Sequence, residues 1–356
     1  MRNRLGVLAL FVLVAAVWGA AVPVAAQQGP AGRVDVFVGQ DAETGLTRLY
    51  FLDALSGLST VVNVESGRYF ALVGDYVIYE KARTGAIMRA NARGMLEPHP
   101  FIRRSAGIEQ IRWAASPDGG AIAWVEVSAD GVSALFVAQA DGSGLRQLPV
   151  STPGAGKMLL PLALSNGMTQ LVYDAAHPLE STPGAPFEVY EHVAAYRIED
   201  ERFVTLPGEP ICPCAAAAAP DGRTVIRLEA AQGRGPFALR VWDVPTGAET
   251  LVPAPNLPYR LAGDLILNET GTLAAYSAAT GNGPPYALIV VDAVGRRQRL
   301  ARSSEEVRYR PLAFIDGDST LMLTDEEAGG TFKLDLTTGE LIRVSDKRYL
   351  GAIGLP

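Results

Sequence analysis

Leu239-Arg240-Val241-Trp242-Asp243, followed by a turn that closes on Gly247, is the clearest copy of a segment that recurs along this chain. Each copy has alternating apolar residues, then a polar residue that is often Asp, then a turn that usually ends on Gly. The other copies span residues 49–57, 87–94, 135–142, 193–200, 288–295 and 332–339. Apolar alternation of this kind is typical of half-buried strands. Copies spaced roughly 40 to 60 residues apart predict the blades of a propeller.

A second repeated element lies upstream of these turns. Ser116-Pro117-Asp118-Gly119 is its clearest copy, and further copies begin at residues 165 and 219, with weaker ones near 74, 269 and 316. Pro sets the first turn dihedral and Gly supplies a positive φ, so each copy indicates a tight hairpin. The order strand, hairpin, strand, loop, strand, turn, strand makes one blade. We therefore predict an all-β, seven-bladed β-propeller of four-stranded antiparallel blades, a single domain over residues 33–355.

These two elements together resemble the propeller of the Tol-system protein TolB and the related WD-like repeats of exported bacterial proteins. The resemblance rests on Trp113…Ser116-Pro117-Asp118-Gly119…Ile122-Ala123-Trp124 and Leu135-Phe136-Val137…Asp141-Gly142…Leu145-Arg146-Gln147-Leu148. The 239–247 segment also looks like the third strand of a WD repeat, but the Gly-His start of that repeat is missing. The resemblance implies a propeller fold and binding of partners. It carries no catalytic residues over to this chain.

The two ends of the repeat region complement each other. The N-terminal blade begins with its second strand, at residues 34–38, while residues 349–355 follow the last complete blade. The tail has the length and polarity of the missing first strand, so we expect it to close the ring and remove the exposed edges. Pro161, Pro213 and Pro311 fall in predicted first strands, where one edge lies free along the central channel and Pro is tolerated.

Residues 1–26 have the pattern of a secretory signal peptide. Arg2 and Arg4 precede an apolar run over residues 5–21, and Val24-Ala25-Ala26 comes before Gln27. The apolar stretch is also long enough for the alternative of an uncleaved membrane anchor. Pro23 and the small-residue exit favour cleavage after Ala26. We therefore expect a secreted or extracytoplasmic protein of the cell envelope, with no stable membrane insertion after cleavage.

The charge balance limits the class of partner. The formal net charge is −7, and it falls to about −9 when Arg2 and Arg4 are removed. An acidic surface disfavours nucleic acid as a partner. No later run in the sequence is long and apolar enough to cross a membrane. A monomer that binds a protein, peptide or glycan is the expectation, and no cofactor is predicted.

The chain has two cysteines, in Cys212-Pro213-Cys214. Residues two apart on a strand point to the same face, with Cα atoms near the upper limit for a disulfide. The export signal places them where disulfides form. A strained disulfide, half of a metal site and two small packed residues remain as alternatives.

The longest predicted loop, between the second and third strands of blade four, holds His177, Glu188 and His192. These residue types bind zinc, but the spacing fits no known zinc motif. A solvated, Pro-rich loop is the favoured interpretation, and no metal is predicted. Loops between second and third strands and loops between blades emerge on one face of a propeller. His177, Glu188, His192, Tyr286 and Tyr309 are therefore the binding candidates on that loop-rich face.

Two functions follow from this sequence. The first is an exported, non-catalytic propeller that binds a protein, peptide or glycan through the loop-rich face. The alternative is an extracytoplasmic lyase or hydrolase acting on carbohydrate with carboxylates on that face. An enzyme needs paired acids, and no motif in the sequence selects such a pair. Binding is therefore the favoured prediction, with no catalytic residue assigned.

Overall fold

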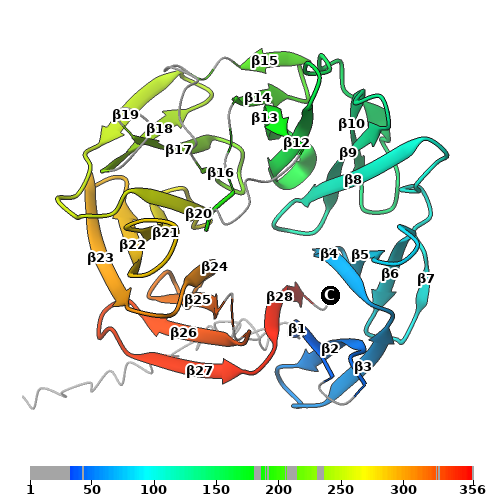
Figure 1. Cartoon of the computed structure of the whole chain (residues 1–356), viewed down its shortest axis with the longest axis horizontal. Helices are drawn as coiled ribbons and strands as arrows, with labels where there is room; N and C mark the ends of the chain where they lie inside the picture. Colours follow the sequence, from blue (N-terminus) through cyan, green and yellow to red (C-terminus); the bar gives the residue numbers. More distant parts are fainter. Residues whose placement is uncertain are drawn as a thin grey trace, which may run out of the picture.

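The computed structural model describes residues 33–354, except for positions 42–43, 180–185, 189, 191, 205, 207–214, 231–235, 326 and 328. The predicted signal peptide and the Cys212–Cys214 pair lie outside the described residues. Within them, seven four-stranded antiparallel sheets form a ring (Figure 1). The predicted seven-bladed all-β propeller is confirmed. No helix in the described ranges is long and apolar enough to cross a membrane.

Each blade runs from an innermost strand beside the ring axis to an outermost strand at the rim. Blade one consists of β28 (Arg348–Gly354), β1 (Arg33–Gln40), β2 (Thr47–Asp53) and β3 (Ser59–Val64). Blade two is β4 (Gly67–Val73), β5 (Tyr76–Lys81), β6 (Ile87–Asn91) and β7 (Leu96–Pro98), and blade three is β8 (Ile108–Ala115), β9 (Ala121–Ser128), β10 (Ser133–Gln139) and β11 (Arg146–Gln147). Blade four is β12 (Lys157–Leu164), β13 (Gln170–Pro178), β14 (Val193–Arg197) and β15 (Arg202–Val204), with the short 3-10 turn η1 (Asn166–Met168) after β12.

The remaining three blades repeat the same order. Blade five is β16 (Ala216–Ala218), β17 (Thr224–Ala230), β18 (Phe237–Asp243) and β19 (Ala248–Val252). Blade six is β20 (Leu261–Leu267), β21 (Leu273–Ala279), β22 (Tyr286–Asp292) and β23 (Arg297–Ser304). Blade seven is β24 (Tyr309–Ile315), β25 (Thr320–Asp325), β26 (Thr331–Asp335) and β27 (Leu341–Ser345).

The hydrophobic core lies between neighbouring blades. In β1, Val34, Val36 and Val38 are buried and alternate with less buried residues, as one buried face of a strand requires. Second strands such as β5 are buried on both faces, because each sheet is packed against a blade on either side. The cluster between blades two and three shows this arrangement and contains Val73, Tyr76, Ile78, Ile87, Ile102, Ile111, Ile122, Trp124 and Ala138.

The recurring Asp of the sequence forms the turn after the third strand. The Asp53 carboxylate accepts hydrogen bonds from the backbone N–H groups of Leu55 and Ser56, at 2.8 and 3.0 Å. Asp243 and Asp335 bond the following turn in the same way. These backbone hydrogen bonds hold the pKa of the Asp53 carboxyl below its usual value. The repeated motif is thus an Asp side chain that replaces missing backbone partners in a tight turn.

Innermost strands pair on one side only and are repeatedly interrupted by bulges. Pro161 in β12 and Pro311 in β24 each lie at a register shift in the pairing with the second strand. A bulge or a free edge is where a strand tolerates the missing N–H of proline. The predicted position of these two prolines is confirmed, while Pro213 lies outside the described residues.

The C-terminal strand closes the ring, as predicted. β28 pairs antiparallel with β1, from Arg33 opposite Gly354 to Val38 opposite Arg348. The strand begins at Arg348, and its Tyr349 and Ile353 are buried, whereas Ala352 is exposed. The hydroxyl of Tyr349 also lies 3.2 Å from a carboxylate oxygen of Asp35. Blade one is therefore assembled from the first and last described strands of the chain.

The hairpins between first and second strands meet on one side of the ring, which we call the turn face. Neighbouring hairpins touch: Gly74 N–H donates to the carbonyl oxygen of Gly119 at 2.7 Å. Asp118 N–H likewise donates to the Asn166 side-chain oxygen at 3.0 Å. Blade one contributes no such hairpin, because its first strand β28 and second strand β1 lie at opposite ends of the described chain. The opposite side, with the loops between second and third strands, is the loop face.

Candidate functional site

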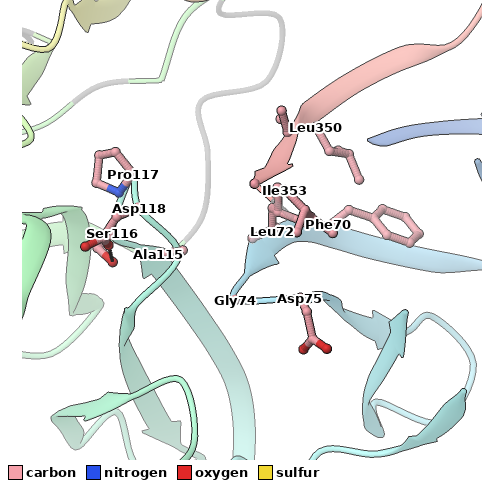
Figure 2. A pocket seen from close by; sticks show the side chains of 15 residues that line it. Phe70, Leu72, Gly74, Asp75, Ala115, Ser116, Pro117, Asp118, Leu350 and Ile353 are labelled. Atoms are coloured by element: carbon pink, nitrogen blue, oxygen red, sulfur yellow. Dashed lines mark hydrogen bonds between the residues drawn. The ribbon is translucent and has the colours of Figure 1, made fainter. Parts of the chain in front are cut away.

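A cavity of about 610 Å³ opens on the turn face beside blade one (Figure 2). Three innermost strands border it: β28, β4 and the end of β8 with its hairpin. The cavity lies next to the position where blade one has no hairpin. Its lining consists of residues 70–72, 74–75, 115–119 and 350–354.

Glycine allows the strands around the cavity to approach closely. Gly351 in β28 has a φ of +142°, and a Cβ at this position would lie 3.1 Å from Leu72 Cδ2 of β4. Gly119 has a φ of +69°, and a Cβ there would lie 2.7 Å from the backbone nitrogen of Gly74. A side chain at either position would be strained by the backbone and would push the walls apart.

The side chains of the lining offer little chemistry. Ser116 Oγ donates to Asp118 Oδ1 at 2.5 Å, and the Gly120 N–H donates to the same oxygen at 2.9 Å. Figure 2 shows the Asp75 carboxylate directed away from Leu350 and Ile353. The lining contains no His, Lys, Arg or Cys among the described residues. Among the described residues β28, β4 and β8 each pair on one side only, so their unpaired backbone edges and apolar side chains such as Leu72 and Leu350 line the cavity.

On the loop face, the surroundings of His177 differ from those predicted. β13 continues through this residue, so His177 lies on a strand and is buried. Its Nδ1 lies 3.3 Å from Asp174 Oδ2, and its Nε2 lies 3.4 Å from Glu188 Oε1. The prediction of a solvated loop is therefore wrong at His177. Pairing with β12 extends the strand through this residue, and the carboxylates of Asp174 and Glu188 supply partners for both nitrogens of its buried ring.

The two carboxylates keep His177 charged. Burial lowers the pKa of the His177 imidazole, but the hydrogen bonds to Asp174 and Glu188 outweigh burial and raise it to about 9. The same contact with His177 lowers the pKa of the Glu188 carboxyl. The group is thus an ion triad at neutral pH. In the described ranges no group of three or more His, Cys, Asp or Glu side chains could hold a metal ion.

The described end of the blade-four insertion reaches blades six and seven. Phe187 is buried in a cluster with Ala279 and Tyr286, and its side chain lies against Gly263 of β20. The Arg308 guanidinium lies 5.3 Å from the centre of the Phe187 ring and donates to the carbonyl oxygen of Pro186. Part of the loop face is therefore covered by this chain itself.

The predicted site residues fall into separate contacts. His177 and Glu188 are brought together, and Tyr286 packs beside Phe187 of the same insertion. The His192 side chain is exposed, and only its backbone N–H joins the group, by donating to Asp174 Oδ1 at 2.8 Å. Tyr309 instead packs against Phe332 in blade seven, with ring centres 5.4 Å apart. The turn-face cavity contains none of these five residues.

Comparison with known proteins gives the fold. No protein-family model matches the chain, and no curated protein matches it in sequence. Among solved structures, a prolyl endopeptidase matches with a TM-score of 0.65 and 12% identity, covering 90% of this chain and 49% of that one. An oligogalacturonate lyase from Vibrio parahaemolyticus matches with a TM-score of 0.57 and 11% identity, covering 86% of this chain and 98% of that one.

TolB from Acinetobacter baumannii is also similar, with a TM-score of 0.45 and 15% identity over 77% of this chain and 64% of that one. TolB is thus among the solved structures that the chain resembles. This chain spans about two thirds of the TolB chain and half of the endopeptidase chain. At these identities the likeness extends to the fold alone.

Proposed function

We propose that this protein is an exported, non-catalytic propeller that binds an extended peptide segment of a partner protein in the turn-face cavity. One observation carries the proposal: three innermost strands with free edges surround a cavity of about 610 Å³. Ligand sites are usually of this size. An extended peptide can pair with the unpaired strand edges through its backbone, while its side chains contact the apolar side chains of the lining, such as Leu72 and Leu350.

The lining favours a peptide over a glycan. A glycan needs several side-chain hydrogen-bond partners, and the hydroxyl of Ser116 already donates to the carboxylate of Asp118. An enzyme would need paired acid and base groups at the cavity. The described lining holds Asp75 and Asp118, and Oδ1 of Asp118 already accepts two hydrogen bonds. For these reasons we place the site at the cavity on the turn face, opposite the loop face favoured by the sequence.

Export is part of the same proposal. Its support is the basic start, apolar run and small-residue exit of residues 1–26. The partner is then a protein of the cell envelope or the surroundings.

Filling the cavity tests the proposal. Ala352 is exposed and lines the cavity, so Ala352→Trp places an indole there without removing a core side chain. The probe is a library of random hexapeptides with free carboxyl ends, tethered at their N-termini. We expect the wild-type protein to capture a subset of sequences, and Ala352→Trp to weaken that capture at least about tenfold.

Ala129→Trp is the matched control, because Ala129 is exposed in the loop between β9 and β10 on the loop face. It should bind the peptides as the wild-type protein does, and both variants should melt near the wild-type temperature. Equal capture by Ala352→Trp and wild-type protein, or no capture by the wild-type protein, would contradict the proposal.

A further inference from the structure

Arg112 and Tyr69 meet beside the ring axis on the same two strands that border the cavity. Arg112 belongs to β8 and Tyr69 to β4, and the guanidinium carbon lies 3.8 Å from the centre of the Tyr69 ring. Trp113 meets the Tyr69 ring edge-on, with ring centres 6.4 Å apart. A flat cation thus lies on an aromatic ring, an arrangement that leaves the N–H groups at the edge of the guanidinium available.

The backbone of Tyr69 is strained. Its φ is +58°, in the left-handed region that residues other than glycine rarely occupy. The β4–β5 register shifts between Arg68 and Ala71, so Tyr69 lies in a bulge that redirects its side chain. The residue is 36% exposed, so the strain is not explained by core packing. Strain of this kind is concentrated where a protein binds ligands.

Arg112 has spare hydrogen-bonding capacity. Among the described residues its guanidinium makes one hydrogen bond, to the carbonyl oxygen of Ile111 at 3.3 Å, and no ion pair. The nearby buried carboxylate of Glu80 pairs instead with Arg68 and Arg104, at 2.6 and 3.2 Å. Burial lowers the pKa of Arg112, but a guanidinium remains charged at neutral pH. The carboxylates of Glu80 and Glu188 attract Arg112 electrostatically, but among the described residues neither forms an ion pair or hydrogen bond with it. The N–H groups of this half-buried cation can therefore still receive an anion.

The position of this cation relative to the cavity identifies the anion. Ala115 lines the cavity, and Arg112 precedes it by three residues on β8, a distance of about 10 Å along a strand. Tyr69 directly precedes Phe70, another lining residue. A peptide that occupies the cavity and continues along β8 therefore reaches Arg112 within about three residues.

We propose that Arg112, lying on the Tyr69 ring, binds the carboxyl-terminal carboxylate of a peptide held in the turn-face cavity. This inference rests on the proposed function and adds the direction of entry: the partner segment inserts with its C-terminus first. A guanidinium and a carboxylate form paired N–H···O bonds, so the site distinguishes a free carboxyl end from a blocked one.

The test compares two forms of one probe. Random hexapeptides tethered at their N-termini are prepared with a free carboxyl end and, in parallel, with a C-terminal amide. We expect the wild-type protein to bind the free-acid form at least about tenfold more tightly than the amide. Arg112→Gln should abolish that preference, and Arg112→Lys should restore part of it.

Arg103→Gln is the matched control, because Arg103 is exposed and its guanidinium donates to the carbonyl oxygen of Pro100. It should keep the full preference, and every variant should melt like the wild-type protein. Peptide binding without a preference for the free acid would overturn this inference and leave the proposed function standing. If the wild-type protein binds neither the free-acid nor the amide form, both this inference and the proposed function are overturned. Arg112-dependent binding of a trigalacturonate in place of peptides would also overturn the inference.

Discussion

The imidazole Nε2 of His99 lies 3.2 Å from the hydroxyl oxygen of Tyr76, and this buried pair connects blade two to blade three. His99 Nδ1 accepts a hydrogen bond from the Ile102 N–H at 3.0 Å, so the ring proton lies on Nε2 and is donated to Tyr76. The Tyr76 hydroxyl in turn donates to the carbonyl oxygen of Ala140 in blade three, at 3.2 Å. Protonation of Nδ1 would break the hydrogen bond that this nitrogen accepts from the Ile102 N–H.

The first prediction is that acid destabilises the ring through His99. Burial, together with the positive charge of Arg89, lowers the pKa of His99 from 6.5 to about 4. The unfolded chain therefore binds a proton between about pH 6.5 and 4 that the native protein does not, and stability falls as the pH falls through this window. The loss is up to about 3 kcal/mol, at about 1.4 kcal/mol for each pKa unit. Urea denaturation at pH 7, 5.5 and 4 measures it.

His99→Asn keeps an oxygen that can accept the Ile102 N–H but cannot titrate. We expect this variant to be less stable at pH 7 and to lose less stability than the wild type between pH 7 and 4. His192→Asn is the control, since the His192 side chain is exposed. If His99→Asn loses as much stability as the wild type between pH 7 and 4, the acid sensitivity belongs to other groups.

The second prediction concerns alkaline pH and has the opposite sign. The pKa of His177 is raised to about 9, so the native protein holds a proton that the unfolded chain releases above about pH 6.5. The stabilisation is complete below about pH 6.5 and is lost as the pH rises through about 9. The melting temperature of the wild type should therefore be lower at pH 9.5 than at pH 6.5. His177→Gln should show a much smaller decrease, and a decrease of wild-type size in that variant would rule out the ion triad as its source.

The third prediction tests ring closure. Deleting residues 348–356 removes the buried side chains of Tyr349 and Ile353 and exposes the inner edge of β1. Two buried side chains at about 1.5 to 3 kcal/mol each give a loss of several kcal/mol, a large share of the stability of a typical domain. The truncated protein should melt far below the full chain or aggregate. Melting within a degree or two of the full chain would mean that the ring closes without β28.

The fourth prediction uses the strained backbone of Tyr69. Glycine adopts a positive φ without the cost of about 1 kcal/mol that other residues incur, so Tyr69→Gly should melt close to the wild type although it removes an aromatic ring. Phe203→Gly is the matched comparison, an exposed aromatic residue on β15 without positive φ. It should melt lower than Tyr69→Gly. At the same time Tyr69→Gly should lose the preference for free carboxyl ends.

The features predicted correctly from sequence are those that local chemistry determines. Asp53 and Asp243 recur because each turn needs a side-chain acceptor for its N–H groups, and this requirement leaves a readable pattern. Ring closure by β28 was equally accessible, because a blade without its first strand leaves an edge that must be covered. The Asp turns follow from short segments of sequence, and ring closure follows from the order of strands within each blade.

The features that the sequence did not reveal depend on contacts between distant segments. The sequence pattern places His177 in a loop, because neither its pairing with β12 nor its contact with the carboxylate of Glu188 is visible in a local segment. The cavity is lined largely by strand edges, which no residue type encodes. Arg112 and Tyr69 lie on different blades, and Tyr69 meets the guanidinium from a bulge in β4 that no sequence pattern announces.

β28 both pairs with β1 and lines the cavity. Binding of a ligand in the cavity is therefore linked to the unfolding equilibrium of the ring. A ligand that contacts β28 binds the closed ring and not the unfolded chain, so it shifts the midpoint of unfolding by mass action. At a free concentration a hundred times the Kd, the gain is about 2.7 kcal/mol. A thermal-shift screen therefore needs no label and no knowledge of the partner, and ligands of the cavity should raise the melting temperature of the full chain while leaving that of the 348–356 deletion unchanged.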